Sequence, residues 1–199
     1  MTPDEDRREH ILDAAVAVVV ERGYGAARVS DIAARAGTST GTVHYYYPTK
    51  VDVLDAALQH AAERSTERHR RELVGLSDPK QRLLRLIDLQ LPDGDVADEW
   101  AIWLEFWNEA RHREELRERG REVYAGWVGI IEQIVRDGVE SGQFRSDASP
   151  NEFATRFAGL FDGLGIQVLL QPTLENRWQL RAIMISMVER ELLSESASV

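Results

Sequence analysis

Apolar residues recur along the chain at the three- and four-residue spacing of one helix face. Near the N-terminus, Ile11, Ala15 and Val18 follow this spacing and predict a first helix. That helix should end at Gly23, because glycine readily adopts the left-handed conformation that follows a helix end. No segment sustains the two-residue alternation of a strand, and no Asn-Gly or Asp-Gly turn joins two β-branched runs. The pattern therefore predicts an all-α protein.

Three more helices complete the N-terminal region. Two short helices are predicted over residues 30–36 and 39–47. The second ends there because Pro48 disfavours helical geometry in the residue before it. A fourth helix is predicted over residues 49–73, where Thr49 forms a capping pattern with the aspartate three positions on.

The second half of the chain predicts five longer helices. Residues 96–110 are apolar almost all round, which is typical of a central helix. The sequence Ser149-Pro150-Asn151-Glu152 combines a cap, a proline at the first helical position and a reciprocal glutamate, so a helix should begin there. The five predicted helices are residues 82–91, residues 96–110, a helix closed by Gly142, a helix from Pro150 that ends before Pro172, and a last helix that includes residues 180–188.

Composition describes an ordinary soluble protein of 199 residues, with 43% hydrophobic and 29% charged residues. No apolar run approaches the roughly 18 residues of a membrane span, and the N-terminus is acidic, unlike an export signal. The chain has no cysteine, which excludes disulfides and thiolate metal sites and suits a reducing compartment. We therefore expect a cytoplasmic protein that does not associate with membranes.

The net charge of −10 argues at first against a nucleic-acid partner, because DNA affinity comes largely from neutralised phosphates. Residues 22–50, however, hold four basic residues and one acid. An acidic body with one basic patch could bind DNA through that patch. Chance clustering on a solvated surface explains the charge pattern equally well.

The two short helices and the turn between them predict a helix-turn-helix. A glycine turn, Ala36-Gly37-Thr38, joins them, and this geometry lets the second helix enter the major groove. The second helix begins with small or polar residues from Ser39 to Thr42, and Gly41 allows the backbone to approach DNA. Four rings follow at residues 44–47, and some must face out because a helix cannot bury four adjacent residues. The alternative is that these rings only decorate the surface.

Residues 31–50, D-I-A-A-R-A-G-T-S-T-G-T-V-H-Y-Y-Y-P-T-K, closely resemble the signature of the TetR family, D-I-A-x-x-A-G-V-S-x-G-T-L-Y-x-Y-F-x-x-K. The resemblance extends over about residues 7–60. It implies an all-α protein of about nine helices, with a DNA-binding head at residues 5–65 and a ligand-binding and dimerising body at residues 66–199. It also implies a homodimeric repressor without a cofactor, released from a palindromic operator by a small-molecule inducer.

The resemblance also assigns roles within the head. Thr40, Gly41, Thr42 and Tyr45 would face bases or nearby phosphates, and the phosphate-clamping residues would be His44, Tyr46 and Lys50. Arg28 stands where the family usually has a capping threonine, so it is expected to reach a phosphate instead. The implied DNA-binding residues are Arg28, Ser39, Thr40, Gly41, Thr42, His44, Tyr45, Tyr46 and Lys50.

Aromatic and acidic residues gather in the predicted body, where Trp100, Trp103 and Trp107 share one helix face. Aromatic walls with a carboxylate suit a cationic ligand. The segments 103–111 and 161–164 are similar to the body of the choline-responsive, BetI-like branch of the family, which implies a choline-like or polyamine inducer. The candidate ligand-binding residues are Trp100, Trp103, Glu105, Trp107, Tyr124, Trp127, Phe157, Phe161 and Asp162. The alternative is core packing for the rings and solvation for the acids.

Three glycines, at positions 159, 163 and 165, would weaken an isolated helix, and close approach of another helix would explain them. The family pairs its last two helices with those of a second subunit. The implied interface residues are Gly159, Gly163, Leu180, Ile183, Met184 and Met187. Packing within one chain is the alternative.

Two other functions fit the sequence less well than that of a regulator. A catalytic di-metal bundle would need a second Glu-x-x-His unit beside Glu109-x-x-His112, and none of the other histidines has an acid three residues before it. No metal or catalytic site is therefore expected. An architectural DNA-binding protein without a ligand would not need the aromatic cluster.

Overall fold

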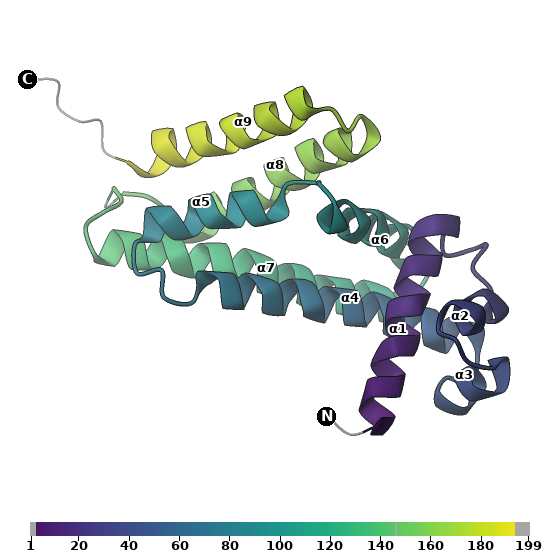
Figure 1. The fold of residues 1–199 in the computed structure, drawn as a ribbon. Helices are drawn as coiled ribbons and strands as arrows, with labels where there is room; N and C mark the ends of the chain where they lie inside the picture. Colours follow the sequence, from purple (N-terminus) through teal and green to yellow (C-terminus); the bar gives the residue numbers. More distant parts are fainter. Residues whose placement is uncertain (1–2, 146, 194–199) are drawn as a thin grey trace, which may run out of the picture. The chain divides into compact units, whose positions relative to one another are not determined.

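A computed structural model describes residues 3–145 and 147–193. These residues form nine α-helices and no strand, which confirms the predicted all-α class (Figure 1). The helices are α1 (Pro3–Arg22), α2 (Val29–Arg35), α3 (Thr40–Tyr46), α4 (Lys50–Leu73), α5 (Pro79–Gln90), α6 (Asp95–Ala110), α7 (Glu114–Glu140), α8 (Pro150–Leu170) and α9 (Leu174–Leu192).

Two compact units divide the chain. The head unit consists of Met1–Ser65 and Ala101–Gly120, and the body unit consists of Thr66–Trp100 and Arg121–Val199. Helices α4, α6 and α7 each contribute residues to both units. The sequence placed residues 101–120 in the body, and the structure packs them with the head. The functional boundary near residue 65 stays a prediction.

In the head unit, α1 contacts α2 and α2 contacts α3 around a core that includes Ile11, Ile32 and Val43. Both predicted glycine ends are confirmed, because Gly23 has a φ of +77° and Gly37 has a φ of +60°. Side chains with a β-carbon rarely adopt these angles. The two glycines thus fix where α1 ends and where the turn between α2 and α3 lies.

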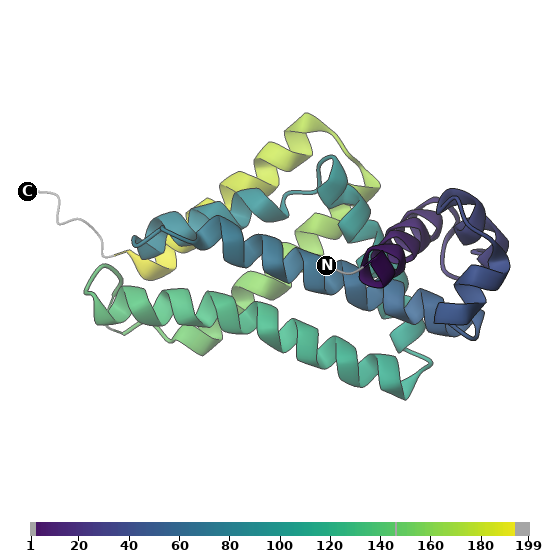
Figure 2. The same cartoon turned by 60° about the horizontal axis from the view of Figure 1, so that its bottom comes forward.

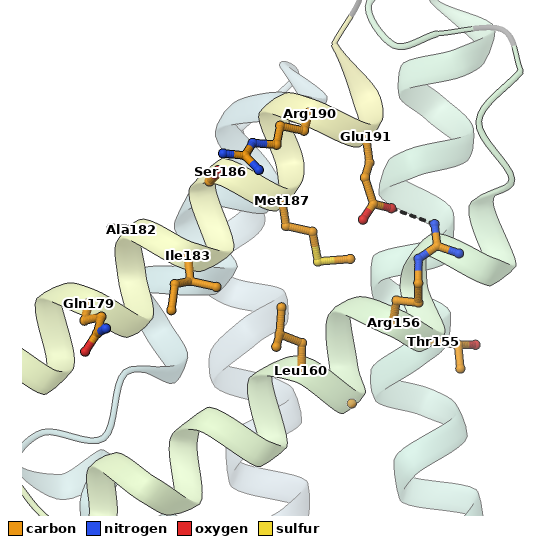
Figure 3. A pocket seen from close by; sticks show the side chains of 11 residues that line it. Thr155, Arg156, Leu160, Gln179, Ala182, Ile183, Ser186, Met187, Arg190 and Glu191 are labelled. Carbon is orange, nitrogen blue, oxygen red and sulfur yellow. Dashed lines mark hydrogen bonds and ion pairs between the residues drawn. The ribbon is translucent and has the colours of Figure 1, made fainter.

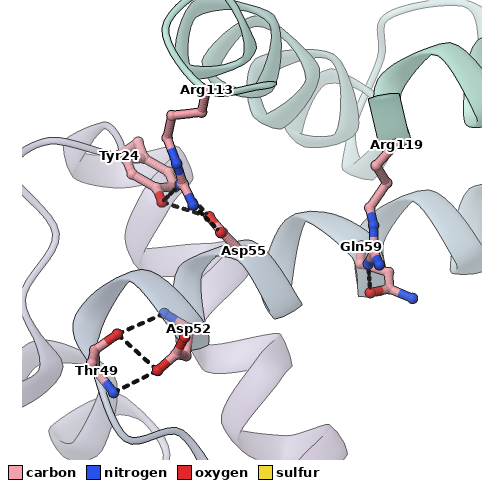
Figure 4. Close-up of polar contacts among 7 residues, drawn as sticks. All are labelled: Tyr24, Thr49, Asp52, Asp55, Gln59, Arg113 and Arg119. Atoms are coloured by element: carbon pink, nitrogen blue, oxygen red, sulfur yellow. Dashed lines mark hydrogen bonds and ion pairs between the residues drawn. The ribbon is translucent and has the colours of Figure 1, made fainter. Parts of the chain in front are cut away.

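Side-chain hydrogen bonds cap α3 and α4, and the cap of α4 is the predicted one. Ser39 Oγ accepts the Thr42 amide at 3.0 Å. Thr49 and Asp52 bond reciprocally: the Thr49 amide donates to Asp52 Oδ2 at 2.9 Å, and the Asp52 amide donates to Thr49 Oγ1 at 3.2 Å (Figure 4). These bonds satisfy amides that lack partners at a helix start.

Residues 101–120 join the head through polar contacts. Asp55 on α4 accepts hydrogen bonds from the Tyr24 hydroxyl at 2.7 Å and from Arg113 Nη1 at 2.7 Å, and a second Arg113 nitrogen also donates to it (Figure 4). Glu105 on α6 accepts the Tyr24 amide at 3.0 Å. The turn after α1 is therefore held by side chains from both α4 and α6.

In the body unit, α9 runs back alongside α8, and α5 contacts α9 (Figures 1 and 2). Phe153, Phe157 and Phe161 lie one turn apart on α8 and are buried, with ring centroids 5.8 and 6.0 Å apart. Trp100 stacks on Phe161 at 6.2 Å with an interplanar angle of 17°. The expectation that no segment is as long and apolar as a membrane span needs correction, because α8 meets that description by length and composition. Its buried face contributes to the core of the body unit.

Two details of the predicted helix starts need correction. Helix α5 begins at Pro79, three residues before the predicted start, because Asp78 caps it by accepting the Gln81 amide at 2.8 Å. Helix α8 begins at Pro150 as predicted, but the Ser149 side chain makes no capping hydrogen bond. The proline, whose φ is already helical, is therefore the local signal that starts α8.

Candidate functional site

The helix-turn-helix presents its predicted reading residues to solvent. Val43 on α3 is buried, whereas Thr40, Gly41 and Tyr45 on the same helix are exposed. The Tyr45 side chain is 80% exposed and meets the Tyr46 ring edge-on, with centroids 5.0 Å apart. An exposed aromatic hydroxyl on a helix with a glycine near its start suits contact with a DNA groove.

The three predicted phosphate clamps have partners within the head unit. Lys50 Nζ donates to the Gly25 carbonyl at 2.8 Å, and the Tyr46 hydroxyl donates to Asp4 at 2.6 Å. The hydrogen bond to Asp4 also raises the pKa of Tyr46 above its usual value. His44 Nδ1 lies 3.1 Å from the Pro48 carbonyl and carries the proton of that hydrogen bond, because a carbonyl oxygen can only accept. A phosphate would compete with the partners of Lys50 and Tyr46.

Two of the four basic residues in the predicted patch form ion pairs with acids. Arg22 pairs with Asp31 at 2.8 Å, and Arg35 pairs with Glu21. Arg28 is exposed at the start of α2 and makes no side-chain cap. Arg28 and Lys50 are thus the basic residues of this segment for which no ion pair with an acid is found among the described residues.

Sequence reasoning missed α1 as part of this surface. The guanidinium of Arg8 lies over the Tyr46 ring, 5.6 Å from its centroid. The positive charge of Arg7 acts against the rise in the pKa of the Tyr46 hydroxyl. The two arginines follow a run of acids in the sequence, so the charge count concealed them.

In the body unit, the structure brings together part of the predicted ligand set. The Tyr124 hydroxyl on α7 donates a hydrogen bond to Asp162 on α8. Burial, which disfavours the charged form, raises the pKa of the Asp162 carboxyl to about 6, and the bond from Tyr124 opposes this rise. Among residues 3–145 and 147–193, no Arg, Lys or His forms an ion pair with Asp162.

Trp100 packs close to this carboxylate. Its indole lies over Gly165, where an added Cβ would be 2.3 Å from Trp100 Cη2. Gly165 is one helical turn after Asp162, so the ring and the carboxylate share one side of α8. Phe157 and Phe161 are almost fully buried and serve the core beneath.

The other predicted ligand residues on α6 belong to the head unit. Trp103 packs edge-on against Phe106 at 5.4 Å and lies 6.3 Å from Trp107. Glu105 accepts the Tyr24 amide. These three side chains are therefore engaged in the packing and hydrogen bonding of the head.

His69 is a residue that the sequence did not single out. It is 3% exposed on α4, and its ring lies 5.2 Å from that of Trp127, another predicted ligand residue. His69 Nε2 is buried without a hydrogen-bond partner. A lone histidine on an amphipathic helix gives no sequence signal that would separate this position from others.

The predicted interface residues divide into two groups. Leu180 and Met184 are buried in the core of their own chain, so they do not form an interface seam as the helical spacing suggested. Gly159, Leu160, Ile183 and Met187 instead line an open groove of about 990 Å³ between α8 and α9, into which the three larger side chains point (Figure 3). Gly163 is also exposed on α8.

Two family profiles match separate parts of the chain. The family profile described as "Bacterial regulatory proteins, tetR family" matches residues 11–57. The profile described as "BetI-type transcriptional repressor, C-terminal" matches residues 79–193, more than half of the chain. The chain belongs to the TetR family. It is a DNA-binding transcriptional regulator, as the resemblance implied.

Three relatives of this TetR-family chain illustrate the similarity. A putative transcriptional regulator from Saccharomonospora viridis, crystallised with choline, is 35% identical, has a TM-score of 0.88 and is matched over 96% of this chain and 100% of that one. The regulator BetI of Yersinia pestis is 26% identical over 94% of this chain and 92% of its own length. The fatty acid metabolism regulator of Bacillus subtilis is 30% identical over 68% and 69%.

We predict that two kinds of substitution separate DNA affinity from DNA specificity. Lys50→Ala should weaken binding to a selected operator and to random DNA alike and reduce the salt slope by about one, because we expect Lys50 to contact a phosphate. Thr42→Ala and Tyr45→Ala should reduce the discrimination between the two DNAs by about 1–3 kcal/mol. Fluorescence anisotropy at several salt concentrations measures both quantities.

Arg35→Ala is the matched control, because Arg35 lies in the same segment but pairs with Glu21. It should change DNA affinity less than Lys50→Ala does. An equal loss on both DNAs for the Lys50, Thr42 and Tyr45 variants would contradict this division of roles.

Proposed function

We propose that this regulator is a cytoplasmic, homodimeric repressor that a cationic amine releases from a palindromic operator, and that it catalyses no reaction. The observation that carries the proposal is Asp162, a largely buried carboxylate with a tyrosine partner and no basic partner among the described residues. Burying an unpaired charge is costly, so such a group is explained by a ligand that completes it.

Aromatic rings near Asp162 suit the same ligand. Tyr124 and Trp127 lie one turn apart on α7, and Trp100 packs on α8 beside Gly165. Each cation–ring contact contributes roughly 0.5–2 kcal/mol. Several such contacts and one carboxylate reach the roughly 8 kcal/mol that corresponds to micromolar affinity.

The relatives support a small cation over a fatty acyl ligand. The Saccharomonospora protein, which matches this chain almost from end to end, was crystallised with choline. The fatty acid metabolism regulator matches a smaller share of the chain. An anionic acyl-CoA would gain nothing from Asp162.

The route we propose for release of DNA runs along α4. This helix begins with Lys50 and continues to Leu73, so it supplies residues to the DNA-binding head and to the body. The ligand must prefer the state of the dimer that does not fit the operator. A 100-fold preference provides about 2.7 kcal/mol per site.

We predict that choline-like cations bind with micromolar affinity and that Asp162→Asn weakens them at least tenfold. Wild-type affinity should fall about tenfold between pH 7.5 and pH 5, because protonation through a pKa near 6 removes the negative charge. Titration calorimetry and tryptophan fluorescence with choline measure these effects. Asp98→Asn, an exposed acid of the same unit, is the control and should retain wild-type affinity.

Replacing Asp162 with asparagine should also stabilise the protein in the absence of a ligand. The folded pKa of Asp162 lies above the ordinary value of 3.8, so the protonated carboxyl stabilises the fold at low pH, and this contribution is lost as pH rises through about 6. Asp162→Asn stays neutral, so at pH 8 its melting temperature should be higher than that of the wild type. Its free energy of unfolding should exceed that of the wild type by at most about 3 kcal/mol.

Release of the protein from DNA by palmitoyl-CoA but not by any amine would contradict the proposal of a cationic ligand.

The groove between α8 and α9 is where we place the dimer interface. Leu160 and Ile183 are 37% and 36% exposed there, and an added Cβ at Gly159 or Gly163 would meet nothing within 4 Å. The open glycines allow a second helix to approach closely. The ion pair of Arg156 with Glu191 at 2.6 Å borders this apolar strip (Figure 3).

We predict that Leu160→Glu combined with Ile183→Glu yields monomers and removes tight binding to a two-half-site operator. Two unpaired carboxylates in an apolar interface should raise the dimer dissociation constant more than about 100-fold. Sedimentation velocity measures the assembly. Val74→Glu is the control, since Val74 is 80% exposed outside the groove and its variant should remain dimeric. A double variant that stays a stable dimer would place the interface elsewhere.

A further inference from the structure

His69 presents a buried polar atom that the protein itself leaves unpaired. Its side chain is 3% exposed, and none of the residues that the structure describes forms a hydrogen bond with Nε2. Native structures rarely leave a buried polar side-chain atom in this condition, because it loses its bonds to water without replacement. A partner from outside the chain would satisfy it.

Neighbouring groups do not take this role. The adjacent Arg68 directs Nη1 to Glu99 at 2.5 Å and Nη2 to the Leu89 carbonyl at 3.2 Å. Burial, assisted by the nearby Arg68 charge, lowers the pKa of His69 to about 4. The imidazole is thus neutral at pH 7, with one nitrogen that donates and one that accepts.

The position of His69 connects it with the proposed cation site. Its ring contacts Trp127, at a centroid distance of 5.2 Å and an interplanar angle of 36°. Tyr124, one turn earlier on α7, donates to Asp162. Residues three apart on a helix have Cβ atoms about 5–6 Å apart, so His69 and Asp162 each contact one of two residues that lie a single turn apart on α7.

We infer that Nε2 of His69 binds the hydroxyl group of a ligand whose cationic end lies at Asp162. The inference rests on the proposed cation site and adds the residue that would distinguish a hydroxylated quaternary ammonium compound from an alkylated one. A hydroxyl group donates and accepts, so it pairs with either tautomer of a neutral imidazole. An alkyl group would leave Nε2 unpaired.

Choline and propyltrimethylammonium, which carries a methyl group where choline carries its hydroxyl, provide the test. Wild-type protein should bind choline about 5- to 100-fold more tightly, the range expected for leaving a buried polar atom unpaired. In His69→Phe the two affinities should agree within about twofold, with propyltrimethylammonium binding retained. His69→Gln, whose amide can bond a hydroxyl, should keep a preference for choline. Calorimetry measures all six affinities.

A spectroscopic measurement on the wild-type protein makes the result independent of how the variants fold. With ¹⁵N-labelled histidine, choline should shift the Nε2 resonance of His69, assigned by its loss in His69→Gln, and propyltrimethylammonium should not. Equal wild-type affinities, or an Nε2 resonance that choline leaves unchanged, would overturn the role of His69 while the cation site stands. Failure of both amines to bind would instead overturn the proposed function and this inference with it.

Discussion

The carboxylate of Asp55 joins three segments of the head unit that are distant in sequence. Arg113 donates to it with two nitrogens, and Tyr24 donates from the turn after α1. Asp55 and Arg113 are half-buried, so removing either one would leave the other charge poorly solvated and unpaired. This network explains why residues 101–120 pack with residues 1–65. The placement of the turn before α2, and hence of the helix-turn-helix, depends on it.

Asp55 and Asp162 show how partners decide the role of the same residue type. Asp55 has a guanidinium and a hydroxyl, and it stabilises a junction. Asp162 has only a tyrosine hydroxyl, and burial raises its pKa to about 6. His69 is the neutral counterpart in the body unit, because it is buried with Nε2 unpaired. The groups that the fold leaves incomplete are the ones that a ligand would complete.

The sequence predicted elements that single residues determine. Gly23, Gly37 and Pro48 each restrict the backbone, so the ends of α1, α2 and α3 could be placed closely. Helical periodicity predicted the all-α class, and the family signature then predicted the regulatory function. The start of α5 was missed although its signal, Asp78 before Pro79, is present.

Long-range packing limited the rest of the prediction. Helical spacing could not separate Leu180 and Met184, which face the core, from Ile183 and Met187, which line the groove, because all four occupy apolar positions of one helix. The three tryptophans of α6 share a spacing as well. Only the fold assigns Trp100 to the body unit and the other two to the head unit.

Thermodynamic linkage gives the most direct test that a cation bound in the body controls DNA binding by the head. If choline weakens operator binding by a given factor, the operator must weaken choline binding by the same factor. We would measure the choline affinity of the free protein and of the protein saturated with a selected operator by calorimetry. We expect an affinity about 5- to 150-fold weaker on DNA, equal to the loss of operator affinity in saturating choline. Equal choline affinities for the free and DNA-bound protein would contradict this expectation.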